Sequence, residues 1–341
     1  YPISSNETKA RLARSLKVAF LILTFALFAG DAQAGQRLET LRSRGFLTCG
    51  ILPVVAGFAS ADTGGGFQGM DVDICRAVAA AVFGDADKVK FSTARNVRQL
   101  RDSDDIDIVA RRITWSLTRA TSNGLIFGPI TFYDGQGFMI PRTAGITDAK
   151  QLAGKAVCVQ AEESHVATLT SYFKDNKLPL KAVLIESNRQ AMQFLADGKC
   201  EAYSADVSLL GAARVSVENG PQDFQILPDM ISKEPLAPLV RQGDDQFLEI
   251  VRWSIFAMIT AEEYGITSKN IDTGARDDVE VRQFLGVVPG NGAALGLDEK
   301  WAYNIIKTVG NYGEMFDRNI GRNSSIKLDR GLNRLWSEGG L

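Results

Sequence analysis

A threonine and an arginine follow a short apolar run in the first half of the chain. Thr114 and Arg119 are five residues apart, and they come after residues 106–110, which we expect to form a buried strand. Open α/β sheets usually hold their ligands beyond the carboxyl ends of such strands. An arginine there can bind a carboxylate or a phosphate with two parallel hydrogen bonds, and a nearby hydroxyl can add another. The pair therefore predicts an anion-binding loop, with a solvated surface arginine as the alternative.

An aspartate occupies a similar place later in the chain. Asp206 follows a predicted strand at 200–205 and precedes a predicted helix at 207–217. Its carboxylate can either bind a ligand at the strand end or cap the helix by accepting from the first backbone N–H groups. The sequence leaves both roles open.

Strands and helices alternate in two blocks, and these blocks position the residues above. Such alternation is typical of α/β folds, so we predict two parallel-rich sheets flanked by helices. Asp71 would cap the first helix, and a long helix at 244–264 precedes a helical tail. The other predicted strands are 46–51, 88–93, 155–160 and 182–186, and the other predicted helices are 71–83, 165–174 and 188–196.

A glycine-rich loop precedes the helix predicted at 71–83. Residues 64–69 read Gly-Gly-Gly-Phe-Gln-Gly, which matches the G-x-G-x-x-G pattern of dinucleotide-binding loops. The match is formal, because a long irregular loop separates these residues from the preceding strand. We therefore favour a β-turn here and predict no cofactor.

The first 34 residues have the pattern of a secretory signal peptide. Four basic residues precede an apolar run at 18–28, and Ala32-Gln33-Ala34 matches an A-x-A cleavage site. The apolar run is too short to span a bilayer comfortably, so a membrane anchor is the less favoured alternative. We therefore predict export, with no stable membrane insertion after cleavage.

The chain that remains after cleavage is mildly acidic. Cleavage removes four basic and two acidic side chains, so the net charge changes from −2 to −4. This balance lacks the basic surface that nucleic-acid binding requires, and we predict no nucleic-acid partner. A chain of roughly 300 residues usually divides into two domains.

All four cysteines lie in the part of the chain that we expect to be exported. An oxidising compartment permits disulfides, and four cysteines allow three pairings. We favour Cys49–Cys75 and Cys158–Cys200, because each would join a strand to a neighbouring element within one block. A zinc site is the alternative, but the chain has no C-x-x-C pair and only one histidine, so we predict no metal.

Several longer motifs resemble those of a known family. They are FQGMDVDICRAVA at 67–79, YDGQGFM at 133–139, SKEPL at 232–236, VRQGDD at 240–245 and GNYGE at 310–314. Together they resemble the general L-amino-acid-binding proteins of bacterial ABC importers, which belong to the family 3 extracellular solute-binding proteins. The resemblance runs from about residue 38 to residue 341.

The resemblance implies a two-lobed periplasmic-binding-protein fold of type II, in which two hinge strands join the lobes. Lobe 1 would comprise 35–134 and 240–341, lobe 2 would comprise 139–233, and the hinge crossovers would lie at 134–139 and 233–240. Such a protein works in the periplasm. It closes over an amino-acid ligand, passes it to the membrane permease of an ABC transporter, and is not an enzyme.

The resemblance also assigns roles to residues. Arg119 would bind the α-carboxylate of the ligand, Thr114 would add a hydrogen bond, and Asp206 would bind the α-ammonium. These roles agree with the physics of burial, because each charge of an enclosed zwitterion must be paired.

Three departures from the family pattern lie at the expected site. Leu52 stands where Asn or Asp is usual, Arg112 where Asn or Ser is usual, and Ala161-Glu162-Glu163-Ser164 where relatives have Thr-Gly-Thr-Thr. An acid about 5 Å from the ligand carboxylate would cost about 3 kcal/mol at an effective dielectric constant near 20. Alternatively, the two glutamates point to solvent and favour the helix N-terminus. We hypothesise that Arg112 pairs with one of them on closure, which would change the ligand specificity.

Other functions remain open on the same fold. Family 3 lobes resemble those of exported cyclohexadienyl dehydratases, and such an enzyme would need a general acid in the cleft, which Glu162 or Glu163 could supply. A sensory or orphan receptor with an altered ligand is the other alternative.

Overall fold

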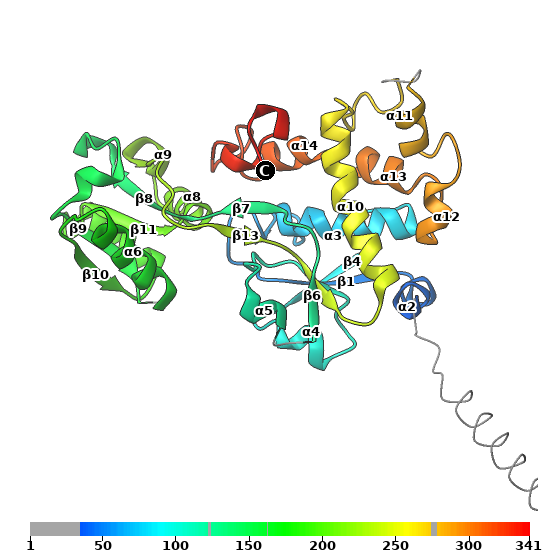
Figure 1. Ribbon diagram of the computed structural model, residues 1–341, viewed down its shortest axis with the longest axis horizontal. Helices are drawn as coiled ribbons and strands as arrows, with labels where there is room; N and C mark the ends of the chain where they lie inside the picture. The colour runs from blue at the N-terminus through cyan, green and yellow to red at the C-terminus, as the bar shows by residue number, and fades with distance from the viewer. Residues whose placement is uncertain (1–34, 122–123, 162, 274–277) are drawn as a thin grey trace, which may run out of the picture.

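The computed structural model describes residues 35–121, 124–161, 163–273 and 278–341, so the predicted signal peptide at 1–34 lies outside the described part. Within that part the chain forms two α/β lobes, joined by the strands β7 (Phe132–Asp134) and β13 (Glu234–Leu236) (Figure 1). Each lobe is built on one five-stranded sheet. No helix in the described ranges is long and apolar enough to cross a membrane.

The sheet of lobe 1 contains strands from both ends of the chain. Its strand order is β4-β1-β5-β14-β6. β1 pairs in parallel with β4 and β5, whereas β14 runs antiparallel to β5 and β6. The chain therefore returns to this sheet after it has completed lobe 2. The strands are β1 (Leu47–Ile51), β4 (Val89–Thr93), β5 (Ile108–Val109), β6 (Leu125–Phe127) and β14 (Leu239–Arg241), and a small hairpin adds β2 (Ser60–Ala61) and β3 (Phe67–Gln68).

The sheet of lobe 2 is mixed, and it includes two strands, β8 and β12, that the sequence analysis did not predict. Its order is β10-β9-β11-β8-β12, in which β9 pairs in parallel with β10 and with β11. β8 and β12 are antiparallel neighbours, because the chain enters along β8 directly from the hinge strand β7 and needs no helical crossover there. The strands are β8 (Gln136–Pro141), β9 (Ala156–Gln160), β10 (Lys181–Ile185), β11 (Ala202–Asp206) and β12 (Phe224–Ile226).

Helices cover both sheets. In lobe 1 the core forms where α3 and α10 pack against each other and against α13. The five apolar residues that the sequence places on one face of α10 are all buried, namely Phe247, Ile250, Val251, Ile255 and Met258. The helices of lobe 1 are α2 (Gln36–Arg44), α3 (Met70–Phe83), α4 (Arg98–Asp102), α5 (Leu117–Thr121), α10 (Asp245–Glu263), α11 (Val279–Phe284), α12 (Asn291–Leu295), α13 (Trp301–Thr308) and α14 (Tyr312–Asn319). Those of lobe 2 are α6 (Glu163–Asp175), α7 (Asn188–Ala196), α8 (Val207–Val215) and α9 (Gly220–Asp223).

The start of α3 differs from the prediction that Asp71 caps it. The helix begins at Met70, and the cap position is taken by Gly69, whose φ of 135° suits glycine. A Cβ atom on Gly69 would lie 2.1 Å from the carbonyl oxygen of Phe58. Asp71 is therefore inside the helix, and its side chain is buried.

The two disulfides have the predicted pairing. Cys49–Cys75 joins β1 to α3, and Cys158–Cys200 joins β9 to the segment before β11. Each bond therefore links a strand to an adjacent element of its own lobe.

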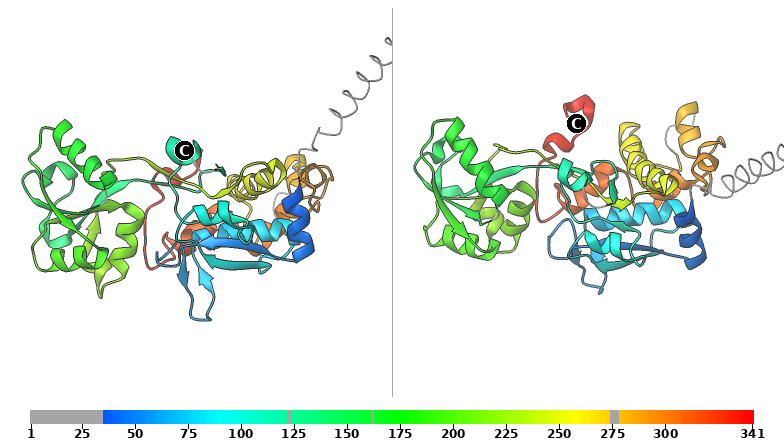
Figure 2. Two further views of the ribbon diagram at one scale, coloured as in Figure 1. Left: turned by 90° about the horizontal axis from the view of Figure 1, so that it is seen from below. Right: turned by 60° about the horizontal axis from the view of Figure 1, so that its bottom comes forward.

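A third chain segment lies beside the two hinge strands (Figure 2). Asn333, near the C-terminus, accepts from the backbone N–H of Tyr133 at 2.7 Å and donates to its carbonyl oxygen at 3.0 Å. Further back in the same segment, the carbonyl oxygen of Ile326 accepts from Arg214 of α8 in lobe 2. We call residues 321–333 the C-terminal strap, because they contact both lobe 2 and the hinge.

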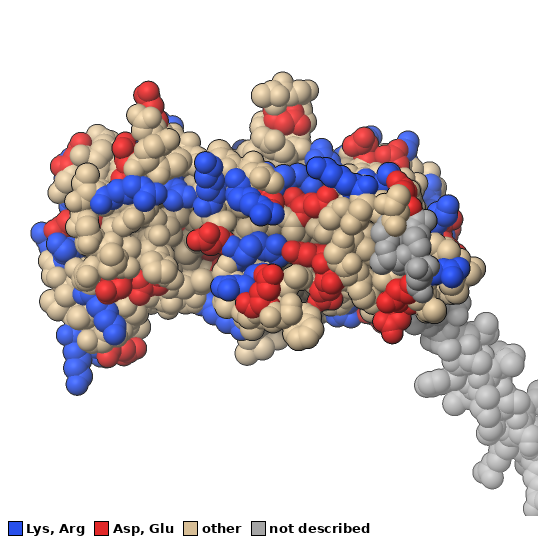
Figure 3. Space-filling view, turned by 90° about the horizontal axis from the view of Figure 1, so that it is seen from above, with Lys and Arg blue, Asp and Glu red and all other residues tan. Residues whose placement is uncertain are grey.

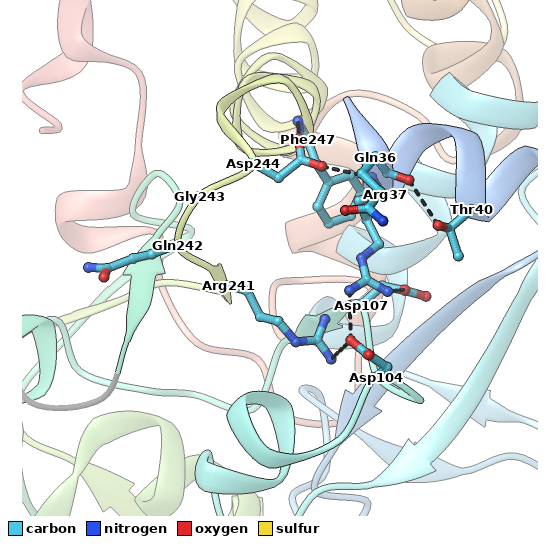
Figure 4. A pocket seen from close by; sticks show the side chains of 10 residues that line it. All are labelled: Gln36, Arg37, Thr40, Asp104, Asp107, Arg241, Gln242, Gly243, Asp244 and Phe247. Carbon is cyan, nitrogen blue, oxygen red and sulfur yellow. Dashed lines mark hydrogen bonds and ion pairs between the residues drawn. The ribbon is translucent and has the colours of Figure 1, made fainter. Parts of the chain in front are cut away.

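A polar cavity of about 350 Å³ lies where α2 meets β14 and α10, at the end of lobe 1 remote from lobe 2 (Figures 1 and 4). Arg37 contacts Asp104 at 3.2 Å and Asp107 at 3.3 Å, and its backbone N–H donates to Asp244 at 2.8 Å. Arg241 also reaches Asp104, at 3.9 Å. The charges here pair with one another, so they tie α2 to the sheet and to α10.

Candidate functional site

Arg112 is the residue at which the two lobes and the hinge meet. Its Nη2 lies 3.5 Å from Oδ2 of Asp134, at the end of β7, and 3.4 Å from Oδ2 of Asp206, at the end of β11 in lobe 2. The guanidinium also lies 5.2 Å from the ring centroid of Phe58, within cation–π range. Arg112 follows β5 with a φ of 56°, a left-handed conformation that non-glycine residues rarely adopt. An ion pair therefore spans the lobes.

Two buried acids surround the backbone and side chain of Arg112. Burial raises the pKa of Asp134 to about 6, although the charge of Arg112 opposes this shift, and Asp134 also accepts from the backbone N–H groups of Gly135 and Ser208. Burial likewise raises the pKa of Asp71 to about 7, against the charge and backbone N–H of Arg112. Both carboxyls therefore titrate close to neutral pH.

Asp206 is ionised and engaged on both oxygens. Its Oδ1 lies 3.2 Å from Nε2 of His165, and its Oδ2 faces Arg112. Burial alone would raise the pKa of Asp206, but the hydrogen bond to His165 and the charges of Arg112 and Arg119 hold it below the usual value. Asp206 precedes α8, yet its side chain makes no capping hydrogen bond. Of the two roles that the sequence left open, the structure therefore does not support helix capping.

Arg119 lies on α5, in the connection after β5, and its side chain is exposed. Its Nη1 donates to the carbonyl oxygen of Thr114 at 3.1 Å, and its charge acts on Asp206 across the gap between the lobes. Within the described ranges Arg119 forms no ion pair with an acid. Thr114 is half-buried and forms a β-bridge with Leu236 of β13. The side chain of Arg119 is thus open to solvent, and anion binding by this loop stays a prediction.

A cavity of about 790 Å³ opens between the lobes, on the side of α7 and α8. Leu52 and Arg112 line it from lobe 1, and Gln160 and Arg189 line it from lobe 2. Much of the remaining wall is apolar, including Val54, Val55, Met192, Leu209, Ala212 and Val217. Arg119, Thr114 and Asp206 do not line this cavity, so Arg112 is the residue that connects it to the predicted loop.

The altered segment of lobe 2 is only partly described. Glu162 and the side chain of Glu163 lie outside the described residues, and Ser164 is exposed in the first turn of α6. The hypothesised pairing of Arg112 with one of these glutamates therefore stays a prediction. The partners that the structure gives Arg112 are Asp134 and Asp206.

The sequence reasoning missed three contributors to the site. His165 is the only histidine of the chain, which was a usable signal, but its contact with Asp206 joins residues 41 positions apart. Asp134 was recognised only as part of a motif, and Asp71 only as a helix cap. Across the described residues, no cluster of three or more His, Cys, Asp or Glu is arranged to hold a metal ion.

Charged side chains of both signs lie on the face of the molecule that Figure 3 shows. Seen from above, basic and acidic side chains are interspersed on both lobes (Figure 3).

Comparison with known proteins finds close relatives over nearly the whole chain. Residues 47–270 match the model of the bacterial extracellular solute-binding proteins, family 3. The chain is 42% identical over 337 residues to the putative amino-acid ABC transporter-binding protein YhdW of Escherichia coli, which covers 98% of both chains. It is 43% identical over 317 residues to the general L-amino acid-binding periplasmic protein AapJ of Rhizobium johnstonii, which covers 91% of this chain and 92% of that one.

Among solved structures, the chain is similar to an ABC transporter periplasmic binding protein from Brucella ovis with glutathione bound. The two are 44% identical, the TM-score is 0.79, and the match covers 89% of this chain and 97% of the other. The likeness extends over both lobes, and with it the predicted type II fold is confirmed.

Proposed function

Because the chain belongs to family 3 of the bacterial extracellular solute-binding proteins, we propose that it is a periplasmic receptor that delivers an amino acid or a related small zwitterion to the permease of an ABC transporter. The observation that carries this proposal is the convergence of charged groups on one interlobe site. Arg112 and Arg119 reach it from lobe 1, and Asp206 and His165 reach it from lobe 2.

Each residue then has a distinct task. Arg119 binds the ligand carboxylate through its exposed guanidinium, and the Thr114 hydroxyl adds a directed hydrogen bond. Asp206, which is ionised at neutral pH, attracts the ammonium group. Leu52 and Arg112 form the lobe 1 wall, and Ser164 lies in the first turn of α6. Glu162 and Glu163 remain proposed ligand-binding residues. The proposed limits are 35–134 and 240–341 for lobe 1, 139–233 for lobe 2, and 134–139 and 233–240 for the crossovers.

Similar proteins support a small ligand without identifying it. The relative from Rhizobium johnstonii is named for general L-amino acids, and the structure from Brucella ovis contains glutathione. Export, predicted from residues 1–34, supports a periplasmic location, and the names of the relatives support an ABC permease as the partner.

A ligand screen on the mature protein tests the proposal. Thermal unfolding is measured alone and with amino acids, opines, polyamines and glutathione, and hits are confirmed by calorimetry. A ligand at about 100 times its dissociation constant stabilises the folded state by about 2.7 kcal/mol, which gives a clear rise in Tm. No rise with any of these compounds would contradict the proposal.

The dehydratase alternative has a direct test. The family model and the relatives are those of binding proteins. Incubation with prephenate and with arogenate should therefore give no product. Turnover of either compound would favour the enzyme.

A further inference from the structure

The wall of the interlobe cavity carries an unbalanced positive charge. Its described lining includes two charged residues, Arg112 and Arg189, and both are cations. Arg189 lies in the first turn of α7, is exposed, and forms no ion pair within the described residues. Nη2 of Arg112 contacts two acids that do not line the cavity, Asp134 at 3.5 Å and Asp206 at 3.4 Å.

Arg112 has donors left over for a ligand. Its side chain is 11% exposed, and its buried Nε has no hydrogen-bond acceptor among the described residues. Both contacts of its Nη2 are long, at 3.4 and 3.5 Å, so the two carboxylates only partly satisfy the guanidinium. A buried cation with unsatisfied donors gains when a carboxylate of a ligand supplies the missing acceptors.

The cavity is also large. Its volume of about 790 Å³ lies in the range of pockets that enclose drug-sized ligands, of roughly 300–1,000 Å³. Apart from the two arginines and Ser216, the lining residues are apolar or amide-bearing. Such a wall suits a ligand body longer than a free amino acid, with a charge at its far end.

We propose that Arg112 and Arg189 form a second anion subsite, so that the preferred ligand is a net-anionic, peptide-sized zwitterion with a second carboxylate. This inference rests on the proposed function, because Arg119 is taken to bind the first carboxylate. Arg112 neutralises much of the charge of Asp206, so the site as a whole favours a ligand with more negative than positive groups.

Isosteric ligand pairs separate charge from shape. Gly-Glu has a side-chain carboxylate where Gly-Gln has a side-chain amide, and L-glutamate and L-glutamine differ in the same way. Calorimetry with the full mature chain should show that the acid of each pair binds at least tenfold more tightly than the amide. We call this ratio of affinities the gap, and it should be largest for the dipeptides. A tenfold gap corresponds to 1.4 kcal/mol.

Arg189→Gln should reduce the gap between Gly-Glu and Gly-Gln to less than about threefold, while the affinity for Gly-Gln stays within about twofold. Arg142→Gln is the matched control, because Arg142 is an exposed arginine of lobe 2 whose side chain contacts Pro221 and Gln225 outside the cavity. It should leave the gap unchanged. Arg112→Gln should reduce the gap as well, and its thermal unfolding shows whether it remains folded.

The possible failures are distinguishable. If wild type binds the amides as tightly as the acids, or if Arg189→Gln keeps the full gap, the second anion subsite is refuted and the receptor function stands. If no amino acid or peptide binds at all, the proposed function itself fails.

Discussion

Replacing Asp71 by asparagine should change how the stability of the protein depends on pH. The side chain of Asp71 is 6% exposed, and burial raises its pKa to about 7 in the folded protein. An aspartate in an unfolded chain titrates near pH 3.9. Between about pH 4 and pH 7 the folded protein therefore binds this proton and the unfolded chain does not.

The expected magnitude follows from the size of the shift. A rise of about 3 pKa units at 1.36 kcal/mol per unit corresponds to roughly 4 kcal/mol. Because the folded pKa is raised, the contribution of Asp71 to the free energy of unfolding is most favourable below about pH 4. It is lost as the pH rises through about 7. Asparagine does not titrate. As the pH rises from about 4 to about 7, the free energy of unfolding of Asp71→Asn should therefore increase by up to roughly 4 kcal/mol relative to that of wild type.

Guanidinium chloride unfolding of the mature, disulfide-intact protein measures this difference at a series of pH values between about 4 and 8. Asp87→Asn is the matched control, since it makes the same chemical change at an exposed position. Its free energy of unfolding should follow that of wild type across this pH range. Parallel stability curves for wild type and Asp71→Asn would refute the reasoning that Asp71 is a desolvated acid.

Three other substitutions test the site and the fold. Arg119→Lys should weaken binding of a carboxylate ligand tenfold or more in calorimetry, because lysine cannot donate in the bidentate geometry, and equal affinities would exclude the assigned role. Changing Cys158 and Cys200 together to alanine should lower the free energy of unfolding by about 2–4 kcal/mol in chemical denaturation, whereas unchanged stability would show that the bond does not constrain the chain. Gly69→Ala should destabilise the protein by at least about 2 kcal/mol, since the new Cβ would lie 2.1 Å from the carbonyl oxygen of Phe58, and an unaltered Tm would contradict the backbone geometry described at the start of α3.

Local pattern was sufficient to predict much of the fold. The apolar spacing in α10 predicted a buried face, and all five residues named from that spacing are buried. The strand ends that precede Arg119 and Asp206 were also located from short apolar runs, because a buried strand and the turn after it leave a local signature. The disulfide pairing followed from the same blocks.

The charge pairing of the site could not be predicted in the same way. Arg112 and Asp206 are 94 residues apart, and their contact depends on how two separately folded lobes face each other. The antiparallel strands of lobe 2 were missed because they come from the crossover segments, which carry no helical spacing. Asp71 was predicted to cap the helix because aspartate is one of the residues preferred at that position. Its burial inside the helix depends on packing that the local sequence does not show.

The C-terminal strap has a mechanical consequence for any rotation of the lobes. It is anchored to lobe 2 at the Ile326 carbonyl oxygen and to the hinge strand at Tyr133, so it acts as a tether parallel to the two covalent connections. A rotation that changes the separation of these anchors puts the tether under tension or lets it go slack. Trp336 lies just beyond the second anchor, and the residue is 72% exposed. The end of the chain thus carries a native fluorophore positioned to report the angle between the lobes.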